Sequence, residues 1–151
     1  MVETPISISL VCLAANQEYP RLQAFVEQSC IRAGCSRRQR LRVILLIEEL
    51  FTNTVQHGRS GVEPVPVNLT FTLADRELKV RYEDGACRYD PFQSLNPKHS
   101  LSDTVELRPL GGLGVLLIRE LGKNVRYAWT KGRNCVTFSM PADAHPERKQ
   151  Q

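Results

Sequence analysis

The sequence predicts an α+β domain, a two-layer α/β sandwich in which a mixed, mostly antiparallel sheet is covered by helices on one face. Three observations support this fold class: alternating apolar residues mark several strands, apolar residues at helical spacing mark the helices, and neighbouring strands follow one another as hairpins. A chain of 151 residues can bury one core but hardly two. We therefore expect a single domain over residues 1–141.

The chain begins with a predicted strand and a predicted helix. "ISISLVCL", residues 6–13, has the composition of a strand, and residues 17–34 are amphipathic at helical spacing. Gly34 ends this helix. The apolar residues expected to share its buried face are Leu22, Phe25, Val26 and Ile31.

A second helix is predicted to begin at "SRRQ", Ser36 to Gln39. This is a capping box, because the Ser hydroxyl and the Gln side chain can each satisfy a backbone N–H that has no partner inside the helix. The helix should run to about His57, where Gly58 stops it.

Two hairpins are predicted in the rest of the chain. Alternating apolar residues at 65–73 and 78–82 flank the turn "ADRE", and residues 124–129 and 134–140 flank the turn "TKGR". Each hairpin supplies two antiparallel strands to the sheet.

The segment between these hairpins has no apolar period over about residues 86–110. A structureless stretch of this length in a compact domain is usually functional, so we interpret it as a lid. A short helix, "GLGVLLIREL", follows at residues 112–121. Residues 142–151 contain no core-forming residues and are expected to form a flexible tail.

Composition argues against several classes of protein. The formal net charge is +4, and Lys and Arg are scattered without the basic stripes and interleaved aromatics of a nucleic-acid surface, so no nucleic acid is expected as a partner. No stretch approaches the roughly 18 apolar residues of a membrane span, and the N-terminus lacks a basic signal region. The five cysteines form no CxxC pair, which favours free thiols. We expect a cytoplasmic protein that does not bind membranes.

The second helix carries a polar stripe made of Glu49, Asn53 and His57. At 100° per residue Asn53 lies about 40° and His57 about 80° from Glu49, whereas the apolar positions lie on the far side. Glu48 lies about 100° away in the other direction, off the stripe. A solvated helix face is the simplest explanation of such a stripe when it is taken alone.

Two further segments favour a binding site over a solvated face. Asp84 stands at the end of a strand before Gly85, where a carboxylate can accept hydrogen bonds from a flat, amino-bearing ligand. Gly111, Gly112 and Gly114 precede a helix N-terminus, which suits phosphate groups. This glycine segment is neither a Walker A loop nor a dinucleotide-binding fingerprint, because the required Lys and the GxGxxG spacing are absent.

In this order, the motifs "EELFTNTVQHG", "DGACRYDP" and "RPLGGLGVLLIRELG" resemble the N, G1 and G2 boxes of the GHKL (histidine kinase-like) ATPases. Within that superfamily the chain looks like the small anti-sigma-factor serine-protein kinases of the RsbW and SpoIIAB type, from the first helix to about Met140. The resemblance implies a Bergerat fold that binds ATP and Mg²⁺.

The resemblance also assigns roles to individual residues. Asn53 matches the residue whose side-chain oxygen ligates Mg²⁺, and Glu49 matches the carboxylate that acts as general base. Asp84 matches the carboxylate that recognises adenine. The positions that match the remaining nucleotide-binding residues are Ala86, Gly112, Leu113 and Gly114. His57 follows the family's "HG" ending, and helix-terminal packing is favoured over a catalytic role.

The second box departs from the family pattern. Ala86 stands where the first glycine of DxGxG is expected, and the bulky Arg88 stands where the second is expected. These departures leave Glu83 as an alternative to Asp84, although counting back five residues from Tyr89 selects Asp84. They also imply weaker nucleotide affinity.

The function implied by the resemblance is phosphorylation of a Ser or Thr on a STAS-domain antagonist protein, with a sigma factor as a further partner, in a partner switch. A homodimer is implied by analogy alone. Three alternatives remain: a non-catalytic, ATP-gated binding module, the catalytic domain of a histidine kinase, and an interaction domain that binds no nucleotide. Against the histidine kinase, no dimerisation helices precede the first strand in this sequence.

Overall fold

The computed structural model describes residues 4–58, 64–93 and 123–142. The predicted helix at residues 112–121, most of the predicted lid and the predicted tail beyond Ala142 lie outside the described residues. The strands within the described ranges are β1 (Ile6–Leu13), β2 (Pro66–Ala74), β3 (Glu77–Asp84), β4 (Lys123–Thr130) and β5 (Arg133–Pro141). They form one sheet in the order β1-β2-β3-β5-β4, and every pairing among them is antiparallel.

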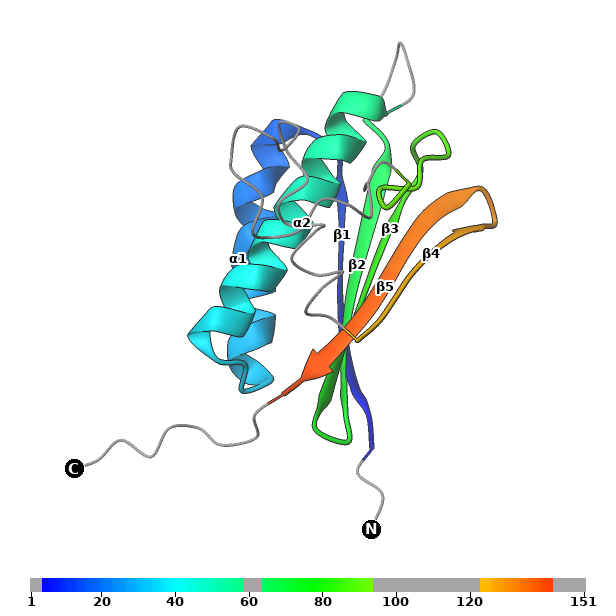
Figure 1. The fold of residues 1–151 in the computed structure, drawn as a ribbon. Coiled ribbons are helices and arrows are strands. Elements are labelled where there is room, and N and C mark those ends of the chain that lie inside the picture. Colours follow the sequence, from blue (N-terminus) through cyan, green and yellow to red (C-terminus); the bar gives the residue numbers. More distant parts are fainter. Residues whose placement is uncertain (1–3, 59–63, 94–122, 143–151) are drawn as a thin grey trace, which may run out of the picture.

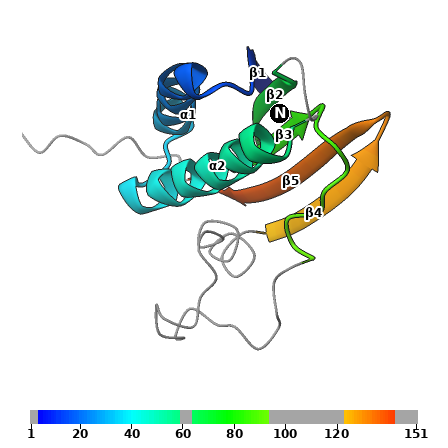
Figure 2. The same cartoon turned by 90° about the horizontal axis from the view of Figure 1, so that it is seen from above.

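Two helices cover one face of this sheet (Figures 1 and 2). Helix α1 (Tyr19–Arg32) follows β1 after a short 3-10 turn, η1 (Asn16–Glu18), and α2 (Arg37–His57) follows α1 directly. The two-layer α+β architecture predicted from the sequence is thereby confirmed.

The start of α2 is set by the predicted capping box. The backbone N–H of Gln39 donates to Oγ of Ser36 over 3.2 Å, and the backbone N–H of Ser36 donates to Oε1 of Gln39 over 2.8 Å. Two N–H groups that the helix cannot satisfy are thus paired. Nε2 of Gln39 also donates to the carbonyl of Pro141 over 2.8 Å, so the same side chain ties the start of α2 to the end of β5.

The first hairpin turns within two residues. Asp75 and Arg76 have φ angles of 51° and 58°. Two consecutive left-handed residues are what the tightest β-hairpin turn requires, because its twist then matches that of the strands. This turn puts β2 and β3 in the register that pairs Val67 with Asp84.

The core lies between the helices and the covered face of the sheet. Its strand residues recur at every second position, and its helix residues recur at three or four positions, as the sequence pattern predicts. The largest fully buried side chains are Tyr82, Phe51, Phe71, Phe138, Leu22, Leu46, Ile47, Leu69, Leu78, Val26 and Val43.

One residue predicted for this core is not part of it. Ile31 is 47% exposed, whereas Leu22 and Val26 are fully buried. Nine residues separate Leu22 from Ile31, which at 100° per residue places the two about 180° apart on the helix. The prediction that Ile31 shares the buried face of α1 was therefore wrong, and Cys30 takes the core position beside it.

Candidate functional site

The last turns of α2 and the end of β3 enclose a small pocket at one end of the sheet. Asn53, Thr54 and His57 line it from α2, and Tyr82 and Asp84 line it from β3. The loop after β3 and the start of β5 close its remaining sides. Three of the predicted site residues, Asn53, Asp84 and Ala86, are thus brought together in one cavity.

The Asp84 carboxylate is held by three donors. Oδ2 accepts the Thr54 hydroxyl over 2.7 Å, and Oδ1 accepts the backbone N–H of Ala86 over 3.0 Å and Nδ2 of Asn134 over 2.9 Å. The side chain is 8% exposed, so these bonds compensate for the water that it has lost. A carboxylate offers about four acceptor positions, and three are used here. One acceptor position therefore remains for a ligand.

A chain of hydroxyl groups stabilises this carboxylate from the core. The Thr54 hydroxyl lies 2.7 Å from the Tyr82 hydroxyl and 2.9 Å from the carbonyl of Leu50. Thr54 has a single hydroxyl proton, and a carboxylate is a stronger acceptor than a carbonyl, so we assign that proton to Asp84. Tyr82 then donates to Thr54. Burial raises the pKa of Tyr82 well above its ordinary value, which keeps this donor protonated.

Asn134 fixes the pocket from β5. It lies directly opposite Asp84 in the β3–β5 pairing, and only 6% of it is exposed. Its amide nitrogen donates to Asp84 and, over 2.9 Å, to the carbonyl of Cys87. Its amide oxygen accepts the Tyr127 hydroxyl over 2.6 Å and the backbone N–H of Tyr89 over 2.8 Å. Since both ends of the amide are engaged, its orientation is determined by the surrounding groups.

The predicted polar stripe of α2 lies beside this network, since Asn53 and His57 line the pocket and Glu49 lies one helical turn before Asn53. Glu49 and Asn53 are half-buried and His57 is exposed, whereas Glu48 lies on the exposed side of the helix. Burial and the nearby Glu48, which also hydrogen-bonds to it, raise the pKa of Tyr19, so Glu48 is engaged with α1. The two neighbouring glutamates therefore have different surroundings, in agreement with the separation of about 100° between them.

Tyr89 partly covers the pocket. Its ring stacks on His57 with a centroid separation of 5.4 Å, and 40% of the residue is exposed. The free space left in the pocket is about 20 Å³. That is room for about one water molecule, so an aromatic base can enter only if Tyr89 or its loop moves. Helix-terminal packing, the role favoured for His57, agrees with this stacking.

Other predicted site residues fall into two groups. Ala86 is buried and lines the pocket, and its backbone N–H donates a hydrogen bond to Asp84. Gly112, Leu113 and Gly114 lie outside the described residues, so their assignment to phosphate stays a prediction. In the described part of the chain no group of three or more His, Cys, Asp or Glu side chains could hold a metal ion. All five cysteines are free thiols.

Sequence reasoning missed Thr54 and Asn134. Each carries a signal that could have identified it, because each is a polar residue at a position expected to be apolar. Thr54 lies about 140° from Glu49 on the core side of α2, and Asn134 is in phase with the buried Val136 and Phe138 of β5. A buried polar side chain needs a partner, and here that partner is the same carboxylate.

The fold and the site define a small α+β domain with a buried, hydrogen-bonded carboxylate at the end of a central strand and a polar helix face beside it. The family described as Histidine kinase-like ATPase domain matches residues 13–140, and the chain belongs to this family. The resemblance drawn from the three motifs is confirmed at this level.

Named relatives agree with this family. Serine-protein kinase RsbW of Listeria monocytogenes serovar 1/2a is 27% identical over 128 residues, which are 82% of this chain and 81% of the relative. Serine-protein kinase RsbW of Listeria innocua serovar 6a matches with the same identity and coverage. Separately, none of the helices in the described ranges is sufficiently long and apolar to cross a membrane.

Proposed function

We propose that this protein is an ATP-dependent serine/threonine-protein kinase that phosphorylates a STAS-type antagonist in a partner-switching pathway, with a sigma factor as its other partner. The observation that carries the proposal is the Asp84 carboxylate, which three donors hold in place and which keeps one acceptor position open beside the polar face of α2. The exocyclic amine of adenine is a donor suited to that position. The relatives named serine-protein kinase support the reaction class.

The residues present fit a Mg²⁺ ion bound together with nucleotide. Mg²⁺ prefers a few hard oxygen ligands from the protein and takes the others from phosphate and water. Asn53 offers an amide oxygen at the pocket, half-buried and one helical turn from the Glu49 carboxylate. When bound, the ion would neutralise charge on the triphosphate. We assign Asn53 as its ligand.

Glu49 is the proposed general base. The substrate hydroxyl attacks the γ-phosphorus of ATP, the bond to the β-phosphate oxygen breaks, ADP leaves, and the hydroxyl proton passes to the Glu49 carboxylate. Glu49 is half-buried on the same side of α2 as Asn53, so base and metal ligand would act on the same phosphoryl group. Gly112, Leu113 and Gly114, with Ala86, are proposed to line the phosphate and nucleotide site by resemblance. The proposed setting is cytoplasmic, and the proposed assembly is a homodimer.

The decisive experiment compares Glu49→Gln with Glu48→Gln. Phosphate transfer from labelled ATP to a co-purified antagonist is measured for both variants. Loss of a general base should slow transfer by about 10² to 10⁴ without removing nucleotide binding. We expect Glu49→Gln to bind Mg-ATP and to hold the antagonist in a stable complex, and Glu48→Gln to transfer phosphate like the wild type. Normal transfer by Glu49→Gln would exclude its role as base.

A second candidate function is a non-catalytic module that binds its partner according to nucleotide state. The observation that favours it is the departure of the second box, where the buried Ala86 replaces a glycine beside a pocket with about 20 Å³ of free space. In the same experiment, nucleotide-dependent partner binding without any transfer by the wild-type protein would select this function over the kinase.

A further inference from the structure

The end of the molecule opposite the pocket carries a groove between α1 and the sheet. The groove has a volume of about 360 Å³. Its apolar lining includes Ile6 at the start of β1, Ile31 in the last turn of α1 and Leu73 near the end of β2. Arg32 and Arg76 line it as well. Its lining comes mainly from the α1–α2 corner and the β2–β3 turn. Both of these segments lie at the lower end of the molecule in Figure 1.

Two large apolar side chains in this groove face solvent. Ile6 is 65% exposed and Ile31 is 47% exposed. A single exposed apolar residue is ordinary on a protein surface and requires no explanation. Here two exposed isoleucines lie in one concave site beside Leu73. Together they form an apolar surface on which a partner side chain could be buried.

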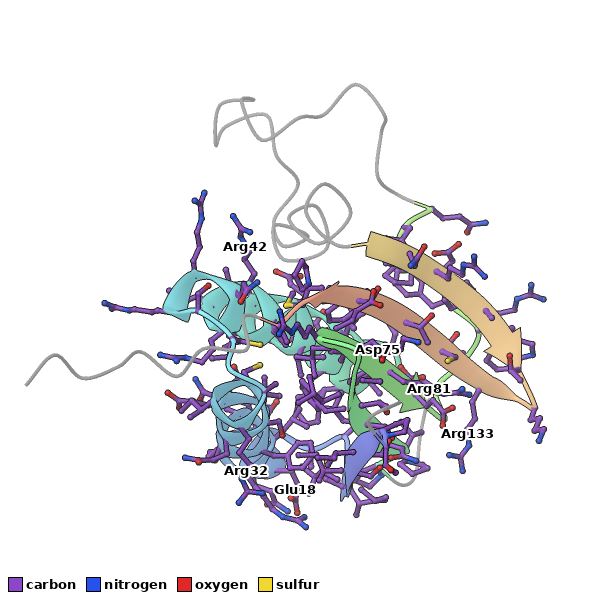
Figure 3. All side chains as sticks on the ribbon, turned by 90° about the horizontal axis from the view of Figure 1, so that it is seen from below. Glu18, Arg32, Arg42, Asp75, Arg81 and Arg133 are labelled. Atoms are coloured by element: carbon purple, nitrogen blue, oxygen red, sulfur yellow. The ribbon has the colours of Figure 1, made fainter. Side chains whose placement is uncertain are left out.

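Arginines stand close together in the sequence at the α1–α2 corner beside the groove. Residues 28–47 contain five arginines and no acidic residue, a formal charge of +5 against +4 for the whole chain. Lys and Arg are scattered over the chain as a whole, and this corner is a local exception. Figure 3 looks at this end of the molecule, with Arg32 on α1 and Arg42 well apart from it on the far side of α2. One carboxylate, Asp75, lines the groove with Arg32 and Arg76.

These arginines violate a local rule of helix stability. The N-terminus of a helix carries partial positive charge and favours acidic side chains, but the first turn of α2 contains Arg37, Arg38 and Arg40 and no acidic residue. No ion pair between described residues engages Arg32, Arg37 or Arg38. Such a conflict is typical of a functional surface.

We propose that this groove binds an acidic, amphipathic segment of a protein partner, whose apolar side chains pack on the exposed isoleucines and whose carboxylates meet Arg32 and Arg76 in the lining. Opposite charges across an interface raise the association rate and select the partner. The chain's own residues 143–151 do not fit this role, because they contain two acidic and two basic residues and no large apolar side chain.

The groove is separate from the proposed nucleotide pocket. The pocket lies at the C-terminal end of α2 and the corner at its N-terminal end, and 21 residues at 1.5 Å each span roughly 30 Å. A partner in the groove could therefore remain bound while the pocket is empty or filled. The inference does not depend on kinase activity.

The test is a selection of random 16-residue peptides, displayed on phage, against the folded full-length protein. We expect the selected peptides to be acidic and to carry apolar residues at helical spacing. Synthetic copies should bind at least about tenfold more weakly to Ile31→Ser/Arg32→Glu, a loss of about 1.4 kcal/mol. Their affinity should also fall when the salt concentration rises from about 50 to about 300 mM.

Val11→Ser/Lys131→Glu is the matched control, because it removes one exposed apolar residue and reverses one exposed charge away from the groove. It should bind the peptides like the wild type. Selected peptides without acidic bias, or equal binding by Ile31→Ser/Arg32→Glu, would overturn the proposal. So would a polyphosphate chain that binds more tightly than the peptides and loses affinity with the same variant, since it would identify a general polyanion site.

Discussion

In the proposed site, Asp84 would contact a nucleotide through the acceptor position that its neighbours leave open. Thr54, Ala86 and Asn134 fix both carboxylate oxygens, so the carboxylate does not need to reorient when a ligand arrives. Preorganisation of this kind lowers the entropic cost of binding. The same bonds make the side chain costly to replace, because a buried donor would lose its partner.

Asp84→Asn should weaken ATP binding by about 1 to 3 kcal/mol, since the amide cannot satisfy both the buried donors and the exocyclic amine. Guanine has a carbonyl group in place of that amine, so we expect GTP to bind more weakly than ATP. The affinity for GTP should also change less than the affinity for ATP in Asp84→Asn. Titration calorimetry with both nucleotides measures the difference. Unchanged ATP affinity in Asp84→Asn would show that the base is recognised elsewhere.

Asn53→Ala should remove the Mg²⁺ dependence of ATP binding and leave thermal stability within about 0.5 kcal/mol of wild type. Asn53 is half-buried, and no hydrogen bond within the described ranges engages its side chain. Nucleotide titrations with and without Mg²⁺ provide the measurement, and Gln56→Ala on the exposed face of α2 is the control. Unfolding of Asn53→Ala would instead identify a structural role.

At the scale of the element, α2 connects the two ends of the protein at which we propose binding sites. Its first turn is capped by Ser36 and tied to β5 through Gln39, and its last turns carry Asn53 and Thr54 into the pocket. Its apolar residues hold it against the sheet between these points. The cap matters more here than in an ordinary helix, because three arginines in the first turn oppose the helix dipole.

Ser36→Ala should destabilise the protein by about 1 kcal/mol, the usual cost of losing an N-cap side chain. In a domain of this size that corresponds to a melting temperature lower by roughly 2 to 4 °C. Ser36→Asp should restore stability, since Asp is an equally good cap and its charge suits the helix N-terminus. Urea unfolding of the three proteins checks this, and identical midpoints for Ser36→Ala and wild type would contradict it.

At the scale of the whole molecule, the two-layer fold separates a pocket at one end of the sheet from an apolar groove with two arginines at the other. The elements that line the two sites lie at opposite ends of the molecule in Figure 1. Tyr89 and its stack on His57 leave the pocket too small for a nucleotide base. Nucleotide binding should therefore displace this loop. The cost of that displacement would lower the observed affinity.

Mg-ATP should stabilise the protein against heat. A ligand present at 100 times its dissociation constant adds about 2.7 kcal/mol, which for a domain of this size raises the melting temperature by roughly 5 to 10 °C. Thermal unfolding with ATP, GTP and no nucleotide is the measurement, and Asp84→Asn is the matched control. An unchanged melting temperature at millimolar ATP would contradict nucleotide binding.

Local patterns in the sequence determined most of the elements and half of the site. Composition placed β1 at residues 6–13, the Ser36 box placed the start of α2, and helical spacing put Glu49 and Asn53 on one face. These features can be predicted because each depends on residues that are close to one another in the sequence. The three motifs in order were sufficient to indicate the family.

The tertiary structure alone decided which polar groups meet. Asn134 contacts Asp84 because β5 pairs with β3 in one register, across 50 residues of chain, and Thr54 reaches the same carboxylate only after α2 packs on the sheet. The groove likewise depends on how the α1–α2 corner approaches the β2–β3 turn. Periodicity states which face of an element is buried, whereas register and packing between distant elements depend on the fit of the whole core.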